Sequence, residues 1–203
     1  MSTVGIFSCQ FNGWYEGFLP GWFEACLATG ADRVVLVSDR DFDVPKGVKL
    51  QVVDAPAGAG APFFLNQAVQ ALGTDWCWNM DIDDLICADS VDQVRFVDAD
   101  VWCAGMRTTE GAVYIPRGVT AERILDVDRN YVNAGSAFRR EVWEECGGYP
   151  NVRLYDWAFW RRLARIGARF ECSDRVDYLY RMGHESLSFR SETPQDRAEA
   201  LAF

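Results

Sequence analysis

Apolar residues in the first half of the chain alternate between short continuous runs and runs with helical spacing. The continuous runs at 4–9, 33–38, 48–53 and 76–80 predict buried strands. Residues 15–29 and 63–72 place apolar side chains at helical intervals, and Gly30 follows the first of these segments as a C-terminal cap. Residues 55–62 are rich in Gly, Ala and Pro, which is typical of a loop. The alternation predicts an α/β fold with a mostly parallel sheet flanked by helices.

The second half of the chain has a more mixed pattern. Residues 101–106 and 112–115 predict a hairpin around Glu110 and Gly111, and residues 131–138 predict an extended segment. Helices are expected near 140–146 and at 155–167, followed by strands at 169–172 and 177–180. From residue 191 the chain is polar and is expected to form a loose tail. We find no repeat and no linker, so we expect one domain over 1–203, with halves 1–100 and 101–190 and a tail at 191–203.

Two acidic loops follow predicted strands, at Asp39–Asp43 and at Asp81–Asp84. Ligands of parallel sheets bind beyond the carboxyl ends of the strands. If the chain stays extended, Asp81 and Asp83 project to one side while Asp84 faces away. Two close carboxylates repel each other unless a cation lies between them, and Mg²⁺ or Mn²⁺ prefers such oxygen ligands. The alternative is a solvated acidic turn that caps the next helix.

Charge and cysteine content narrow the class of protein. The net charge of −10 resides in residues 1–100, which carry 5 basic and 15 acidic side chains. This acidic half disfavours binding to duplex nucleic acid. The seven cysteines are an odd number and contain no CxxC pair, which disfavours a disulfide framework or a zinc site and indicates small core residues. No apolar run approaches the ~20 residues of a membrane span, and no signal peptide is evident, so we expect a cytoplasmic protein.

Two further residues are candidates for chemistry. Asp156 falls in the first turn of the helix expected at 155–167, where the helix dipole favours an ionised carboxylate. Such a carboxylate could act as the general base for a sugar hydroxyl, or it could be an ordinary aspartate at a helix start. His184 is the only histidine. It is either a surface or core residue, or a neutral imidazole ligand of the same metal.

Taken in order, these segments resemble the family 2 glycosyltransferases of the GT-A fold. The similarity in the first half lies in Val4–Trp14, Leu36–Asp39, Phe64–Ala68 and Asn79–Asp84. In the second half it lies in Gly135–Trp143, Cys146–Tyr149, Asp156–Phe170 and His184–Ser188. Leu65 stands where this family usually has an arginine, and Tyr155 stands where it usually has a glutamate.

The resemblance implies an inverting, metal-dependent transfer of a sugar from a nucleoside-diphosphate sugar, most often UDP-linked, to an acceptor hydroxyl. The cofactor would be Mn²⁺ or Mg²⁺. Asp156 would be the catalytic base. Asp39 would contact the nucleotide base, with Ser8, Asn66 and Asp81 also on the donor. Asp83 would ligate the cation, with Asp81 and His184 as further candidate ligands.

Two other functions remain open at this stage. A GT-A-like nucleotidyltransferase would normally carry a basic, glycine-rich loop after the first strand, but residues 10–14 contain no Lys or Arg. A non-catalytic module could bind a nucleotide sugar or a protein partner without turnover. The acceptor could be a glycan, a protein side chain, a small metabolite or, less favoured by the acidic charge, a modified base on DNA. The oligomeric state cannot be read from the sequence.

Overall fold

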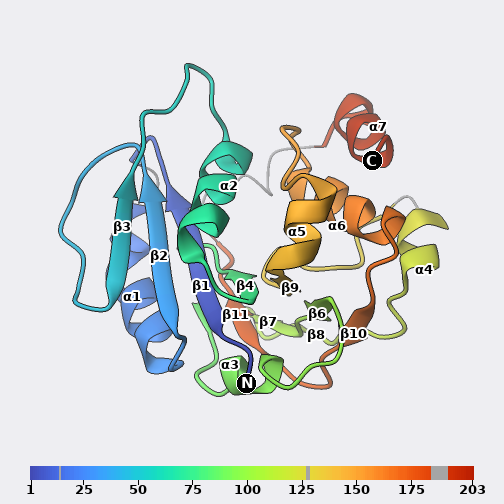
Figure 1. The fold of residues 1–203 in the computed structure, drawn as a ribbon, viewed down its shortest axis with the longest axis horizontal. Helices are drawn as coiled ribbons and strands as arrows, with labels where there is room; N and C mark the ends of the chain where they lie inside the picture. Colours follow the sequence, from blue (N-terminus) through green and yellow to red (C-terminus); the bar gives the residue numbers. More distant parts are fainter. Residues whose placement is uncertain (14, 127–128, 184–191) are drawn as a thin grey trace.

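A seven-stranded sheet forms the centre of the molecule (Figure 1). The computed structural model describes residues 1–13, 15–126, 129–183 and 192–203. The strands of this sheet are β1 (Val4–Gln10), β2 (Arg33–Ser38), β3 (Val48–Val52), β4 (Trp76–Asn79), β6 (Val101–Cys103), β9 (Ala137–Arg139) and β10 (Phe170–Cys172). They lie in the order β10-β6-β9-β4-β1-β2-β3, and β9 alone runs antiparallel to its neighbours. The predicted α/β class with a mostly parallel sheet is therefore confirmed.

A second, four-stranded sheet lies beside the first. Its strands are β5 (Leu85–Ile86), β7 (Met106–Thr108), β8 (Val113–Tyr114) and β11 (Tyr178–Tyr180), in the order β5-β11-β7-β8. β7 and β8 form the predicted hairpin. The prediction of one continuous strand over 101–106 was wrong, because β6 belongs to the large sheet and β7 to the small one.

Gly105 lies where the chain crosses between the two sheets. Its N–H donates to the Asp177 carboxylate at 2.8 Å, and its carbonyl accepts the Asp177 N–H at 2.8 Å. A Cβ atom at this position would lie 2.0 Å from the carbonyl oxygen of Arg175. This close approach of two backbone segments requires glycine at residue 105.

Helices cover both faces of the large sheet (Figure 1). The helices of the described chain are α1 (Leu19–Ala28), α2 (Ala61–Leu72), α3 (Ser90–Val94), α4 (Ala121–Asp126), α5 (Arg140–Cys146), α6 (Tyr155–Arg165) and α7 (Pro194–Leu201), with a 3₁₀ turn, η1, at Glu16–Phe18, and α7 packs on α6, away from the sheet. Strand alternation divides the core. Phe7 and Val35 pack with α2, α5 and α6, while Ile6 and Val34 pack with α1, α3 and the small sheet.

Aromatic contacts attach α6 to the large sheet. Phe138 of β9 lies 5.0 Å from Phe159 and 6.2 Å from Trp160, measured between ring centroids. The ring of Tyr149, which precedes α6, lies 6.0 Å from that of Phe138. Phe138 is also the direct neighbour of Cys77 on β4. These contacts fix the start of α6 relative to the end of β4.

Several predicted boundaries require correction. The helix expected from residue 15 begins at Leu19, because Tyr15 has a left-handed backbone with φ of 64°. The helix expected from 63 begins at Ala61, since Pro62 suits the first turn of a helix. The extended segment expected at 131–138 is a strand only from Ala137. The short helices α3 and α4 were not predicted.

The prediction of a loose C-terminal tail was also wrong. Thr193 and Asp196 form a reciprocal capping box at the start of α7, and Pro194 occupies the first turn. α7 packs against α6, and Arg153, which precedes α6, pairs with Asp196 at 2.6 Å. Within the described ranges, each helix is too short or too polar to traverse a bilayer.

Candidate active site

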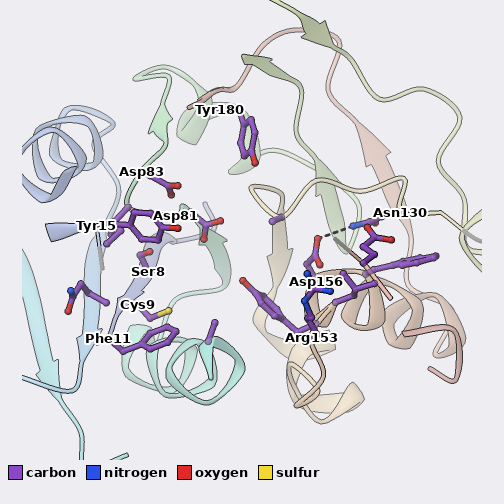
Figure 2. A pocket seen from close by; sticks show the side chains of 18 of the residues that line it. Ser8, Cys9, Phe11, Tyr15, Asp81, Asp83, Asn130, Arg153, Asp156 and Tyr180 are labelled. Atoms are coloured by element: carbon purple, nitrogen blue, oxygen red, sulfur yellow. Dashed lines mark hydrogen bonds between the residues drawn. The ribbon is translucent and has the colours of Figure 1, made fainter. Parts of the chain in front are cut away.

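A pocket of about 390 Å³ opens at the carboxyl ends of β1 and β4 (Figure 2). One side is formed by the end of β1, by Tyr15 and by the acidic turn after β4. The opposite side is formed by the start of α6, the segment at 129–134 and part of α7. A volume of this size lies within the range of small-molecule sites in proteins. Its place beyond the strand ends is where the sequence predicted a ligand.

The acidic segment Asp81–Asp84 forms a turn, in which the Asp84 N–H donates to the Asp81 carbonyl at 2.9 Å. The turn begins at a fixed point, because the Met80 carbonyl accepts the Trp22 indole N–H at 2.9 Å. Carboxylate oxygens of Asp81, Asp83 and Asp84 lie within 4.8 Å of one another. The expectation that Asp84 faces away was therefore wrong, because strand alternation does not continue into the turn.

The carboxylates of this turn are crowded. Burial, followed by the charge of Asp83, raises the pKa of Asp81 to about 7. Burial, followed by the charge of Asp81, raises the pKa of Asp84 to about 9. The Asn79 amide donates to Asp81 at 3.1 Å, while its buried Oδ1 has no hydrogen-bond partner among the described residues. These crowded oxygen atoms fit a hard divalent cation, which would relieve the repulsion between them.

Arg181, directly after β11, holds the acidic turn from the small sheet. Its backbone N–H donates to the Asp84 carboxylate at 2.8 Å, and its Nε donates to the Asp83 carbonyl at 2.7 Å. Its guanidinium group lies 4.9 Å from the centre of the Phe18 ring. Arg181 was not predicted as a site residue, and its position at the end of a predicted strand was the one available signal.

Asp156 lies in the first turn of α6 and faces the acidic turn across the pocket (Figure 2). The Asn130 amide donates to the Asp156 carboxylate at 2.9 Å. Burial raises the pKa of Asp156, and the Trp157 and Asn130 N–H groups oppose that shift only in part. Desolvation therefore outweighs the backbone donors at this helix start, and the expectation that Asp156 is ionised near neutral pH stays a prediction.

The other predicted donor-binding residues, Ser8, Asp39 and Asn66, lie in three different places. Ser8 lines the pocket and is almost fully buried. Asp39 lies at the end of β2, outside the pocket lining, and its carboxylate accepts the Asn12 N–H at 2.9 Å. Asn66 lies on another cavity, of about 310 Å³, where its amide donates to the Tyr149 carbonyl and accepts the Tyr149 N–H, both at 2.9 Å. The roles of Ser8, Asp39 and Asn66 in donor binding stay predictions.

The two departures from the family pattern have clear places. Leu65 is a fully buried residue of α2, and Tyr155 lines the pocket next to Asp156. His184 lies outside the described residues, so its role as a metal ligand stays a prediction, and Trp14 also lies outside them. All seven cysteines are free thiols, and Cys26, Cys77 and Cys103 are fully buried.

Three arginines that the sequence analysis did not assign to the site also line the pocket. Arg129 precedes β9, Arg153 precedes α6, and Arg197 belongs to α7. Arg197 pairs with Glu192 at 3.4 Å, and its guanidinium lies 5.5 Å from the Trp157 ring. Arg197 could not be assigned because α7 itself was not predicted.

No protein-family model matches the chain. An uncharacterised glycosyltransferase from Haemophilus influenzae is 24% identical over 210 residues, which cover 92% of this chain and 78% of that protein. The structure is similar to that of S. aureus TarS 1–349 in complex with UDP-GlcNAc, with a TM-score of 0.76 and 17% identity. That match covers 98% of this chain and 64% of the TarS chain, so this chain spans less than two thirds of its length.

A second structural relative is the mannosyltransferase PcManGT from Pyrobaculum calidifontis, in complex with GDP-Man and Mn²⁺. The TM-score is 0.62 at 16% identity, over 88% of this chain and 56% of that one. The chain therefore has the fold of solved glycosyltransferases. The resemblance to GT-A glycosyltransferases that the sequence indicated is confirmed at this level, while its assignment to family 2 stays a prediction.

Proposed function

We propose that this protein is a metal-dependent, inverting glycosyltransferase that uses a nucleoside-diphosphate sugar, UDP-linked as in the TarS complexes. The observation that carries the proposal is the arrangement of carboxylates in one pocket. Asp81 and Asp83 lie on one side of the pocket, and Asp156 lies on the other (Figure 2). The acidic side is suited to bind a divalent cation together with a diphosphate, and the carboxylate on the opposite side is suited to act as a general base.

The proposed reaction needs one base and no enzyme nucleophile. Asp156 removes the proton from the acceptor hydroxyl as that oxygen attacks the anomeric carbon. The bond between this carbon and the diphosphate breaks, and the nucleoside diphosphate leaves with the electron pair. Attack from the face opposite the leaving group inverts the anomeric configuration. The raised pKa of Asp156 makes it a stronger base than an exposed aspartate, while still leaving it ionised at sufficiently high pH.

Asp81 and Asp83 would hold the divalent cation, with Asp84 close beside them. When bound, Mn²⁺ or Mg²⁺ supplies positive charge that stabilises the leaving diphosphate. PcManGT offers a parallel, because its solved complex contains Mn²⁺. Ser8 and Tyr15 line the same side of the pocket, which supports the proposal that they contact the sugar donor.

Two variants separate the two sides of the pocket. With a panel of UDP- and GDP-sugars, calorimetry measures donor binding with and without Mn²⁺, and release of nucleoside diphosphate measures turnover. Asp83→Ala is expected to lose metal-dependent donor binding. Asp156→Asn is expected to keep donor binding but to lose turnover by about 10²- to 10⁴-fold, the usual contribution of a general base.

Wild-type turnover that persists in a chelator would contradict the metal dependence, and an active Asp156→Asn enzyme would contradict the assignment of the base. Release of pyrophosphate from a nucleoside triphosphate and a sugar phosphate would instead indicate a nucleotidyltransferase. Metal-dependent binding of a donor, with no turnover on any acceptor or water, would indicate a binding module.

A further inference from the structure

We infer that Asn130 is a positioning residue that orients the Asp156 carboxylate for proton abstraction. The inference rests on the proposed function, in which Asp156 is the base. The Asn130 side-chain amide donates to Oδ2 of Asp156 at 2.9 Å (Figure 2). Asn130 lies on the segment before β9, 26 residues from Asp156 in the sequence, so the contact depends on the tertiary fold.

The orientation of the Asn130 amide is fixed from its other end. Its Oδ1 accepts the backbone N–H of Val132 at 3.2 Å. A flipped amide would place an oxygen against the carboxylate and an NH₂ group against a backbone donor, and both contacts would be repulsive. The NH₂ group of Asn130 must therefore face Asp156.

The segment that carries Asn130 is itself anchored to the fold. The Asn133 amide donates to the Ala104 carbonyl at 2.9 Å, and the Tyr131 carbonyl accepts the Tyr114 hydroxyl at 3.2 Å. The guanidinium groups of Arg123 and Arg129 lie 4.4 and 4.6 Å from the centre of the Tyr131 ring. This anchoring lets Asn130 restrict the carboxylate, instead of following its motion.

Several groups around Asp156 affect the charge on its carboxylate, to which the Asn130 amide donates a hydrogen bond. Burial raises the pKa of Asp156, and the charge of Glu192 raises it further. The pocket around Asp156 also contains Asp81 and Asp83 on the far side and Tyr155 beside it. Among the residues that the structure describes, the positive groups lining that pocket are Arg129, Arg153 and Arg197.

The Asn130 amide favours the ionised carboxylate, because a hydrogen bond to a charged acceptor is stronger than one to a neutral acceptor. An amide also cannot take up the proton that Asp156 removes from the acceptor. The bond to Oδ2 fixes the orientation in which the carboxylate receives that proton. A base that is both ionised and oriented is what general base catalysis requires.

The test compares Asn130→Ala with Asn151→Ala, a matched exposed asparagine outside the pocket. The first readout is the pKa of Asp156, measured by carboxyl NMR titration without donor or metal, and assigned with Asp156→Asn. We expect Asn130→Ala to raise this pKa, because the ionised carboxylate loses a hydrogen-bond donor. Asn151→Ala should leave it unchanged. An unchanged pKa in Asn130→Ala overturns the inference.

The second readout is turnover with saturating donor and Mn²⁺ as a function of pH. Asn130→Ala should shift the acidic limb of kcat to higher pH and lower the plateau by about tenfold, as expected for loss of one charge-assisted hydrogen bond. The donor KM should stay within about twofold of wild type. A lower kcat without a shifted limb would indicate only a structural role and would also overturn the inference.

These two readouts separate the inference from the proposed function. If wild-type protein turns over no donor but the pKa of Asp156 responds to Asn130→Ala, the contact is upheld and the proposed function fails. If wild-type protein is active and neither the pKa nor the acidic limb responds, the inference fails alone.

Discussion

Arg181 shows at the scale of single residues how the candidate metal site is supported from outside. Its side chain holds the Asp83 carbonyl, and its backbone holds the Asp84 carboxylate. Removal of a group that hydrogen-bonds to a metal ligand and orients it commonly lowers metal affinity by about 10- to 100-fold. Arg181 also carries a positive charge, which by itself opposes the binding of a cation. The geometric and the electrostatic effects therefore have opposite signs.

Substitution with lysine separates these two effects. Arg181→Lys keeps the charge but loses the Nε–H bond to Asp83, so we expect Mn²⁺ to bind about tenfold more weakly. Titration of free Mn²⁺ by electron paramagnetic resonance measures this affinity directly. Arg181→Met, which removes the charge as well, should bind Mn²⁺ more tightly than Arg181→Lys. Wild-type affinity in Arg181→Lys would show that the acidic turn keeps its shape without this contact.

Sequence reasoning at this scale succeeded where residues lie next to a predicted strand or helix end. Asp81, Asp83 and Asp156 were placed in advance and share one pocket. It failed for the orientation of Asp84 and did not anticipate the desolvation that raises the pKa of Asp156, because burial depends on segments that are distant in the sequence. Asn130 and Arg181 were missed for the same reason, since each acts on a partner at least 26 residues away.

Secondary-structure elements were predicted well where their periodicity is unbroken. β2 begins and ends where the sequence predicted it, at Arg33 and Ser38. The prediction of one strand over residues 101–106 was wrong, because the sequence is apolar enough for a strand on both sides of Gly105. The chain crosses between the two sheets at Gly105. The capping box of α7, at Thr193 and Asp196, was visible in the sequence, but a short polar helix that depends on packing against α6 gives little periodic signal.

Gly105 provides a test at the scale of elements. Gly105→Ala places a methyl group on the Arg175 carbonyl, so the two sheets must separate locally. We expect a loss of at least ~2 kcal/mol in the free energy of unfolding, typical of overpacking at a buried site. Urea denaturation followed by tryptophan fluorescence measures it.

Gly21→Ala is the matched control for this substitution, because Gly21 lies in α1 and has no atom within 4 Å of an added Cβ. It should be neutral or stabilising by about 0.5–1 kcal/mol, since alanine favours helices. Equal stability of Gly105→Ala and wild type would mean that the crossing between the sheets yields easily.

Buried and half-buried carboxylates determine how the stability of the whole molecule depends on pH. Their pKa values are raised, so the folded state keeps protons that the unfolded chain releases above about pH 4. Stability should therefore fall as pH rises from about 4 towards 9. The groups are Asp81, with a pKa of about 7, Asp84, with a pKa of about 9, and Asp156 and Asp177, whose pKa values are raised by burial.

Other titrating groups affect this range less. Several exposed aspartates with lowered pKa values, among them Asp32 and Asp75, contribute stability above their unfolded pKa that is lost only at lower pH. Cys103 and Cys172 face each other on adjacent strands. The hydrogen bond with Cys103 lowers the pKa of Cys172 to about 6, so this single thiol adds stability as pH rises from about 6 to 9 and opposes part of the trend set by the four carboxylates. The raised pKa of Cys103 lowers stability only above about pH 9.

We therefore expect the metal-free protein to melt at a lower temperature at pH 8 than at pH 5. Mn²⁺ should raise the melting temperature more at pH 8, because it binds deprotonated carboxylates. At 100 times its dissociation constant, Mn²⁺ contributes about 2.7 kcal/mol, or roughly 5–10 °C for a chain of this size. Differential scanning fluorimetry at both pH values tests this, with Asp83→Ala as the control that should not respond. An equal response at both pH values would contradict it.

The pairing of β4 with β9 has a consequence for how such a protein can diversify. Through Phe138, this antiparallel contact ties the helix carrying Asp156 to the strand that leads into the acidic turn. The distance between Asp156 and the acidic turn is therefore set by the pairing of β4 with β9 and by the packing of α6 on β9. Under the proposed function, exchange of Phe11 or Tyr15, which line the pocket on the β1 side, is therefore expected to change which sugars bind without changing that distance, which makes these two positions the natural targets for directed evolution.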